Sequence, residues 1–81
     1  MNNAASIIKQ IRQLDESIKN DPRNSDLYYD RGKLHWKLNN RGAAISDFNM
    51  AVSLNPDSPA KERVDMANDI MDFYNTDLYN P

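Results

Sequence analysis

Apolar residues recur at helical spacing in four successive segments of this chain. In the first segment they are separated by steps of four, three and four residues, with polar side chains between them: Ile7, Ile11, Leu14 and Ile18. A stripe with this period is typical of an amphipathic helix, which we expect over residues 4–20. The helix must end before Pro22, because proline disfavours helical backbone in the preceding residue and has no N–H to donate.

The next two segments are predicted to form a helical hairpin. Polar side chains at 24–26 can accept hydrogen bonds from the free N–H groups of a first turn, and the apolar spacing predicts a helix over 25–38. The stretch 39–42 is Asn-Asn-Arg-Gly, and Asn and Gly best tolerate the left-handed backbone that reverses a helix. A short turn makes the following helix, predicted over 42–54, an antiparallel neighbour.

A fourth helix is predicted over residues 59–74, followed by a tail over 75–81. Ser58 can cap this helix and Pro59 suits its first position, because proline there loses no helical hydrogen bond. The C-terminal stretch 72–81, which includes the tail, is rich in aromatic residues beside two aspartates. We expect it to be partly ordered, either against the apolar end of the helices or on a cationic surface of the same or a second molecule.

The helical segments also repeat. Pro22 and Pro56 lie 34 residues apart, and the residues before them match in register, as Ile11 with Ile45 and Leu14 with Phe48. A period of about 34 residues with helical hairpins is typical of tetratricopeptide units. Residues 25–58 resemble that family at positions of matching type and spacing: Tyr28, Gly32, Leu38, Ala44, Phe48, Ala51 and Pro56.

The resemblance implies a single all-α domain over 1–81, in which antiparallel helical hairpins stack as a short, TPR-like α-solenoid of about four helices. One full repeat is preceded by half a repeat. Met66 stands where the full repeat has Gly32 and is too bulky for a second close crossing, so the last helix is interpreted as a cap. Arg31 and His35 depart from the aliphatic and aromatic residues usual in the family.

The composition and the motifs of the sequence favour a binding protein over an enzyme. With 40% hydrophobic and 27% charged residues the chain is ordinary for a soluble globular protein, and a net charge of −2 argues against nucleic-acid binding. It has no cysteine, phosphate-binding loop or hydrolase motif, and His35 is its only histidine. We therefore expect no enzyme activity, cofactor, metal or small-molecule substrate. The N-terminal residues resemble no signal peptide and no segment could span a membrane, so we expect a cytoplasmic protein.

Charge is unevenly distributed along the chain. Residues 1–41 hold eight Lys and Arg against five Asp and Glu, whereas residues 42–81 hold two against seven. Asp65, Asp69 and Asp72 fall on one helical face at steps of four and three; we interpret them as a solvated acidic face rather than a metal site. The asymmetry favours an acidic partner for the first half, or contact between copies of the chain.

Family members line a concave groove with the first helix of each repeat, and the resemblance assigns six residues to that groove here. They are aromatic or charged: Asp26, Tyr29, Lys33, Trp36, Lys37 and Arg63. Cations and large aromatic side chains suit a protein segment that carries carboxylates. The predicted function is a non-catalytic module that binds an extended or helical, acidic segment of another protein. The alternative is a homo-oligomerisation module that uses the same surface and the acidic, aromatic C-terminal residues, because one and a half repeats are few for a stable stack.

Overall fold

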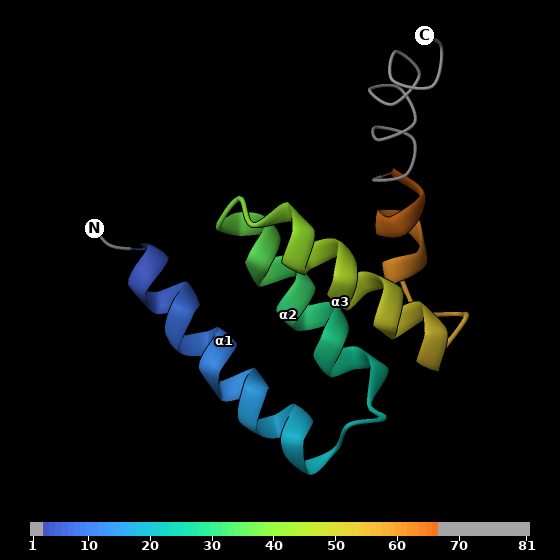
Figure 1. Ribbon diagram of the computed structural model, residues 1–81, viewed down its shortest axis with the longest axis horizontal. Coiled ribbons are helices and arrows are strands. Elements are labelled where there is room, and N and C mark those ends of the chain that lie inside the picture. The colour runs from blue at the N-terminus through green and yellow to red at the C-terminus, as the bar shows by residue number, and fades with distance from the viewer. Residues whose placement is uncertain (1–2, 67–81) are drawn as a thin grey trace, which may run out of the picture.

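The computed structural model describes residues 3–66, which form antiparallel α-helices. Three of them are complete: α1 (Asn3–Asn20), α2 (Ser25–Lys37) and α3 (Arg41–Leu54). Helix α2 lies between α1 and α3, and residues 60–66 begin a further helix near the end of α3 (Figure 1). No strand occurs within residues 3–66. The predicted all-α fold of antiparallel hairpins is confirmed.

The helix ends follow the local signals with small differences. Asn24 caps α2, and its side-chain oxygen accepts a hydrogen bond from the Asp26 N–H at 3.1 Å. Ser58 is buried, and its Oγ accepts from the Ala60 N–H at 3.1 Å, as a cap should. In the α2–α3 turn Asn39 takes the left-handed conformation, with φ of 63°, and Gly42 does not. Gly42 instead lies in the first turn of α3, which starts one residue earlier than predicted.

The last predicted elements fall largely outside the described residues. Helix 59–74 is represented by residues 60–66, and the tail 75–81 lies wholly beyond them. Met66, the last described residue, has 58% of its surface exposed.

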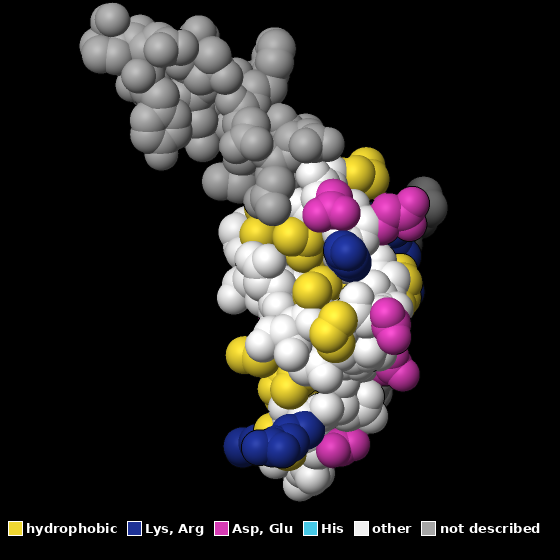
Figure 2. Space-filling view, turned by 90° about the vertical axis from the view of Figure 1, so that its right-hand side faces the viewer, with side chains coloured by type: hydrophobic (Ala, Val, Ile, Leu, Met, Phe, Trp, Pro, Cys, Tyr) yellow, Lys and Arg dark blue, Asp and Glu magenta, His cyan; other side chains and the backbone are white. Residues whose placement is uncertain are grey.

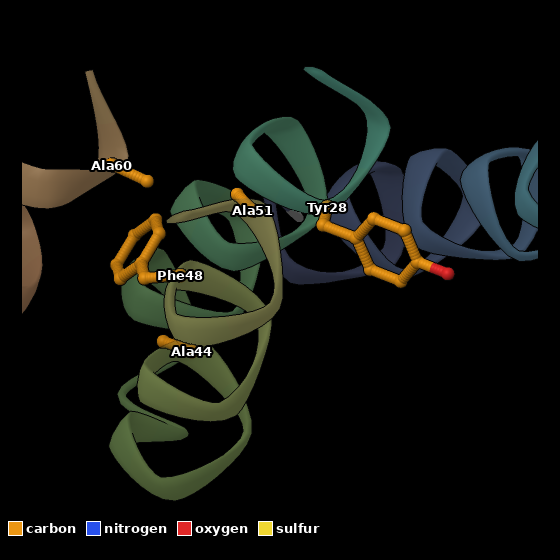
Figure 3. Packing of buried hydrophobic residues seen from close by; sticks show 5 residues of the cluster. All are labelled: Tyr28, Ala44, Phe48, Ala51 and Ala60. Atoms are coloured by element: carbon orange, nitrogen blue, oxygen red, sulfur yellow. The ribbon is translucent and has the colours of Figure 1, made fainter. Parts of the chain in front are cut away.

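The core lies where α2 meets α3. Phe48 is fully buried together with Ala44, Ala51 and Ala60, and Tyr28 is 9% exposed (Figure 3). Small residues let the two helix backbones approach each other, and the Phe48 ring fills the space beside them. The Tyr28 hydroxyl remains satisfied because it donates to the Pro22 carbonyl at 2.9 Å.

Gly32 sets the distance between α2 and α3. A Cβ atom built on it would lie 2.6 Å from Phe48 Cε1 and 3.2 Å from the Ala44 carbonyl oxygen. The first distance is far below van der Waals contact, so the buried phenyl ring or the helix backbone would have to shift to admit a methyl group. The glycine is therefore required by packing, in spite of its cost of about 1 kcal/mol in a helix.

Arg31 joins all three helices. Its Nε and Nη2 donate to the two carboxylate oxygens of Asp47 on α3, each at 2.8 Å, and its Nη1 donates to Asp15 Oδ1 on α1 at 2.9 Å. The Asp47 side chain is 8% exposed and the Asp15 side chain is 51% exposed. Arg31 stands where the resemblance implies an aliphatic residue. The structure shows that this residue replaces an apolar contact with a two-sided ion pair.

Hydrogen bonding to Asp47 raises the pKa of Arg31 above its already high ordinary value, with a further contribution from Asp15 and against the cost of burial. Because the pKa of Arg31 is higher in the folded than in the unfolded state, its charge stabilises the fold fully below the ordinary pKa. This stabilisation is lost as the pH rises through the folded-state pKa. Both values lie far above neutral pH, so Arg31 carries a permanent charge.

Replacing Gly32 with alanine should destabilise the fold. We expect the G32A substitution to lower the free energy of unfolding by about 1–3 kcal/mol, because the new methyl group overpacks the Phe48 site. Gly42 is the matched control, since a Cβ atom there meets nothing within 4 Å. G42A should leave stability unchanged or raise it by up to about 1 kcal/mol. Urea unfolding followed by circular dichroism measures both, and an equal effect of the two substitutions would contradict the packing argument.

The two carboxylates around Arg31 should contribute unequally. D47N leaves the half-buried guanidinium without its bidentate partner and should cost about 2–3 kcal/mol of unfolding free energy. D15N removes an exposed partner and should cost less than about 1 kcal/mol. Chemical denaturation of the two variants and of the double variant gives each value and their coupling. Equal losses would show that Asp47 is not the principal partner.

Candidate functional site

Helix α2 has one face that its neighbours cover only in part. Tyr28 and Gly32 turn toward α3 and are buried, whereas Leu34 turns toward α1. Between these two directions lies a stripe of side chains that we call the α2 face. It consists of half-buried Tyr29, Lys33 and Trp36 and exposed Lys37. Burial on both sides fixes the orientation of the helix, so this face is held in place by the core and by Arg31.

One side of the α2 face borders a groove against α1, which we call the α1–α2 groove. Its volume is about 540 Å³, and it is lined by Gln10, Gln13, Leu14, Ser17, Asp30, Lys33, Leu34 and Lys37. Lys33 Nζ lies 3.6 Å from Asp30 and 4.4 Å from the centre of the Tyr29 ring. Lys37 has no carboxylate within 4 Å among residues 3–66. The groove therefore offers two lysine ammonium groups and two glutamine amides.

The other side of the α2 face borders a small hollow, which we call the Trp36 hollow. It has a volume of about 60 Å³ and is lined by Trp36, Phe48, Arg63 and Met66. The Arg63 guanidinium carbon lies 6.0 Å from the centre of the Phe48 ring, and that of Arg41 lies 5.3 Å from the Trp36 ring. Such guanidinium–aromatic contacts are favourable and hold a cation beside an apolar surface.

Tyr29 contacts one lining residue of the groove, Lys33, and one of the hollow, Phe48. Its ring packs on Phe48, with 6.0 Å between ring centres and an interplanar angle of 47°, and also carries the Lys33 ammonium. Tyr29 and Trp36 both pack against the buried core. The aromatic side chains of the α2 face are thus anchored in the core while part of each reaches solvent.

The structure places the six predicted site residues in three locations. Lys33 and Lys37 line the α1–α2 groove, Trp36 and Arg63 line the hollow, and Tyr29 lies between the two. Asp26 is exposed in the first turn of α2, eleven residues and therefore about 16 Å along the axis from Lys37. Five of the six thus border adjoining surfaces, and Asp26 is remote from the end that holds Lys37 and Trp36.

Several residues of these surfaces were missed from the sequence. Gln10 and Gln13 face Lys33 and Lys37 across the groove, and Met66 closes one side of the hollow. The spacing of α1 could have suggested the glutamines, because they flank its apolar stripe on one side. Nothing in the linear pattern places Met66 beside Trp36, since that contact depends on how residues 60–66 pack against α3.

His35 belongs to the core side of α2 rather than to the α2 face. Its Nε2 lies 3.8 Å from Asp47 Oδ2, and its buried Nδ1 has no hydrogen-bond partner among the residues described. Within the same part of the chain no three His, Cys, Asp or Glu side chains are grouped so that they could hold a metal ion. Two of the three aspartates of the predicted acidic face, Asp69 and Asp72, lie outside residues 3–66.

The surface on the side of residues 60–66 mixes side-chain types. Figure 2 shows hydrophobic side chains that reach the surface between separate acidic and basic ones. The large apolar side chains most exposed within the described chain are Ile8, Met50 and Met66. Of these three residues only Met66 lines the hollow, and neither Ile8 nor Met50 lines the groove or the hollow.

Comparison of the chain with family models, with curated proteins and with solved structures finds no significant match. Among the described residues no helix is both long and apolar enough to cross a membrane. The case for a function therefore depends on the geometry of the α2 face.

Proposed function

We propose that this protein is a non-catalytic protein–protein interaction module, which binds an acidic segment of a partner protein on the α2 face. The observation that supports this most directly is the arrangement of cations around partly exposed aromatic rings. Lys33 and Lys37 line one side of the face, and Arg63 borders the other. Trp36 and Tyr29 lie between them.

Electrostatics favour an acidic ligand. Lys37 makes no ion pair within residues 3–66, and Lys33 is paired only with exposed Asp30, an interaction worth little in water. A carboxylate of the partner would form charge-assisted hydrogen bonds with these lysines, and only a weak existing ion pair would be lost. The aromatic rings add contact area at low entropic cost, because the core already restricts their rotation.

The resemblance to tetratricopeptide units supports the same proposal. The close contact of Gly32 with Phe48 and Ala44 is the kind of packing that the repeat positions imply. In that family, the face that corresponds to the α2 face is the one that binds a partner. Cytoplasmic location and the lack of a cofactor belong to the same proposal, since they rest on the sequence alone.

Self-association remains the alternative. In that case the partner segment is supplied by a second copy of the chain, through residues 72–81, which are acidic and aromatic and lie outside the described residues. The exposed side chain of Met66 beside the hollow is the one described feature that favours it. Sedimentation velocity at high micromolar concentration separates the two functions, because only self-association predicts a dimer without an added ligand.

Neutralising the groove lysines should weaken capture of acidic peptides. We expect K33Q/K37Q to reduce the affinity for capped peptides rich in Asp and Glu by at least about tenfold, because charge-assisted hydrogen bonds are lost. K9Q/K19Q is the matched control: it removes the same charge from exposed positions of α1 that do not line the groove. Titration of Trp36 fluorescence, the chain having one tryptophan, gives each affinity.

Unequal losses in the two double variants would support a specific site on α2. Equal losses would show that only the net charge of the protein attracts the peptides. If peptides of the same composition with Asn and Gln in place of Asp and Glu bind as well as the acidic ones, the proposed partner class is wrong.

A further inference from the structure

The Trp36 hollow has a shape and size that restrict what it can hold. Two aromatic rings, those of Trp36 and Phe48, form its walls, and the Met66 side chain and the Arg63 stem complete it. Phe48 is fully buried, whereas Met66 is 58% exposed. The hollow is therefore mainly apolar, and the exposed Met66 side chain forms part of its lining.

Its volume decides which side chain fits. The hollow measures about 60 Å³, whereas an apolar cavity that accepts benzene measures about 150 Å³, and about 10–15 Å³ is enough to admit one water-sized group. An aromatic ring is thus too large, and a methyl group alone leaves much of the space empty. A branched aliphatic side chain of the size of valine fills it best.

The charges around the hollow decide what flanks that side chain. Arg63 lies over Phe48 and Arg41 lies over Trp36, and neither makes an ion pair within residues 3–66. A guanidinium on the face of a ring keeps N–H donors that can take a carboxylate in a bidentate manner. Acidic residues next to the inserted side chain would meet these donors.

We propose that the Trp36 hollow receives one small, branched aliphatic side chain of the partner segment, and that acidic residues beside it pair with Arg41 and Arg63. This inference rests on the proposed function and makes it more specific. The partner motif is an aliphatic residue with acidic neighbours, in which the aliphatic residue acts as the anchor. Burial of the anchor against Trp36 also explains how a small module gains selectivity among acidic segments.

A peptide series tests the size limit. The probes are short capped peptides with two acidic residues on each side of one central residue, which is Ala, Val or Phe. Isothermal titration and Trp36 fluorescence measure binding to the full chain. The valine peptide should bind about tenfold tighter than the alanine peptide, the usual scale for methyl groups entering an apolar pocket. The phenylalanine peptide should bind more weakly than the valine peptide.

Widening the hollow by substitution should shift the peptide preference toward the larger side chain. M66A widens the hollow, and because the Met66 side chain is exposed the fold should be kept. The phenylalanine peptide should then gain affinity relative to the valine peptide. M50A is the control, since Met50 is similarly exposed, at 45%, and does not line the hollow.

The outcomes separate this inference from the proposed function. If all three peptides bind equally, or the phenylalanine peptide binds best to the unchanged protein, the hollow is not an anchor site, while lysine-dependent binding still supports the acidic partner. If no acidic peptide binds, the proposed function itself fails. If Trp36 fluorescence instead changes with protein concentration alone and a dimer forms, the occupant is a second copy and the proposal is overturned.

Discussion

The close contact of α2 with α3 at Gly32 is the constraint on which the remaining structure depends. Phe48 occupies the space that any side chain at position 32 would need, and Ala44 brings the two backbones near each other. This contact fixes both the distance and the rotation of α2. Once the rotation is fixed, the partly exposed side of α2 must carry Tyr29 and Trp36. The proposed binding surface, the α2 face, thus depends on this one helix crossing.

Arg31 extends this constraint to α1. A guanidinium bonded bidentately to buried Asp47 and singly to Asp15 holds three helices at a point where an aliphatic side chain would hold two. The bonds to Asp47 are directional, so they specify the register of the hairpin more narrowly than apolar contact does. The α1–α2 groove lies beside this point, which means that the lysines of the groove are presented on a defined wall.

The sequence predicted the helices well because each boundary had a local chemical cause. Proline ended helices, Asn24 and Ser58 capped them, and the apolar period gave their core faces. The sequence predicted left-handed backbone within the Asn-Asn-Arg-Gly turn but not at which residue, and Asn39 adopts it while Gly42 does not. The paired role of Arg31 could not be read from the chain, since Asp15 and Asp47 are each 16 residues away and come near only through tertiary packing.

The candidate site was predicted as one stripe and is divided into a groove and a hollow. Helical spacing correctly placed Lys33, Trp36 and Lys37 on one side of α2, but it could not show which neighbour each would border. Met66 lines the hollow because of the way residues 60–66 pack. Local periodicity therefore predicted the α2 face. The α1–α2 groove and the Trp36 hollow beside it depend on the relative position of the helices.

The most direct test of the central claim is a nuclear magnetic resonance titration of the isotopically labelled full chain with an acidic capped peptide. If the α2 face is the binding surface, the largest shift changes should occur at the Trp36 indole N–H and at the backbone amides of Tyr29, Lys33, Lys37 and Arg63. Shifts concentrated around Ile8 or Met50, or a titration that moves no resonance, would contradict the account.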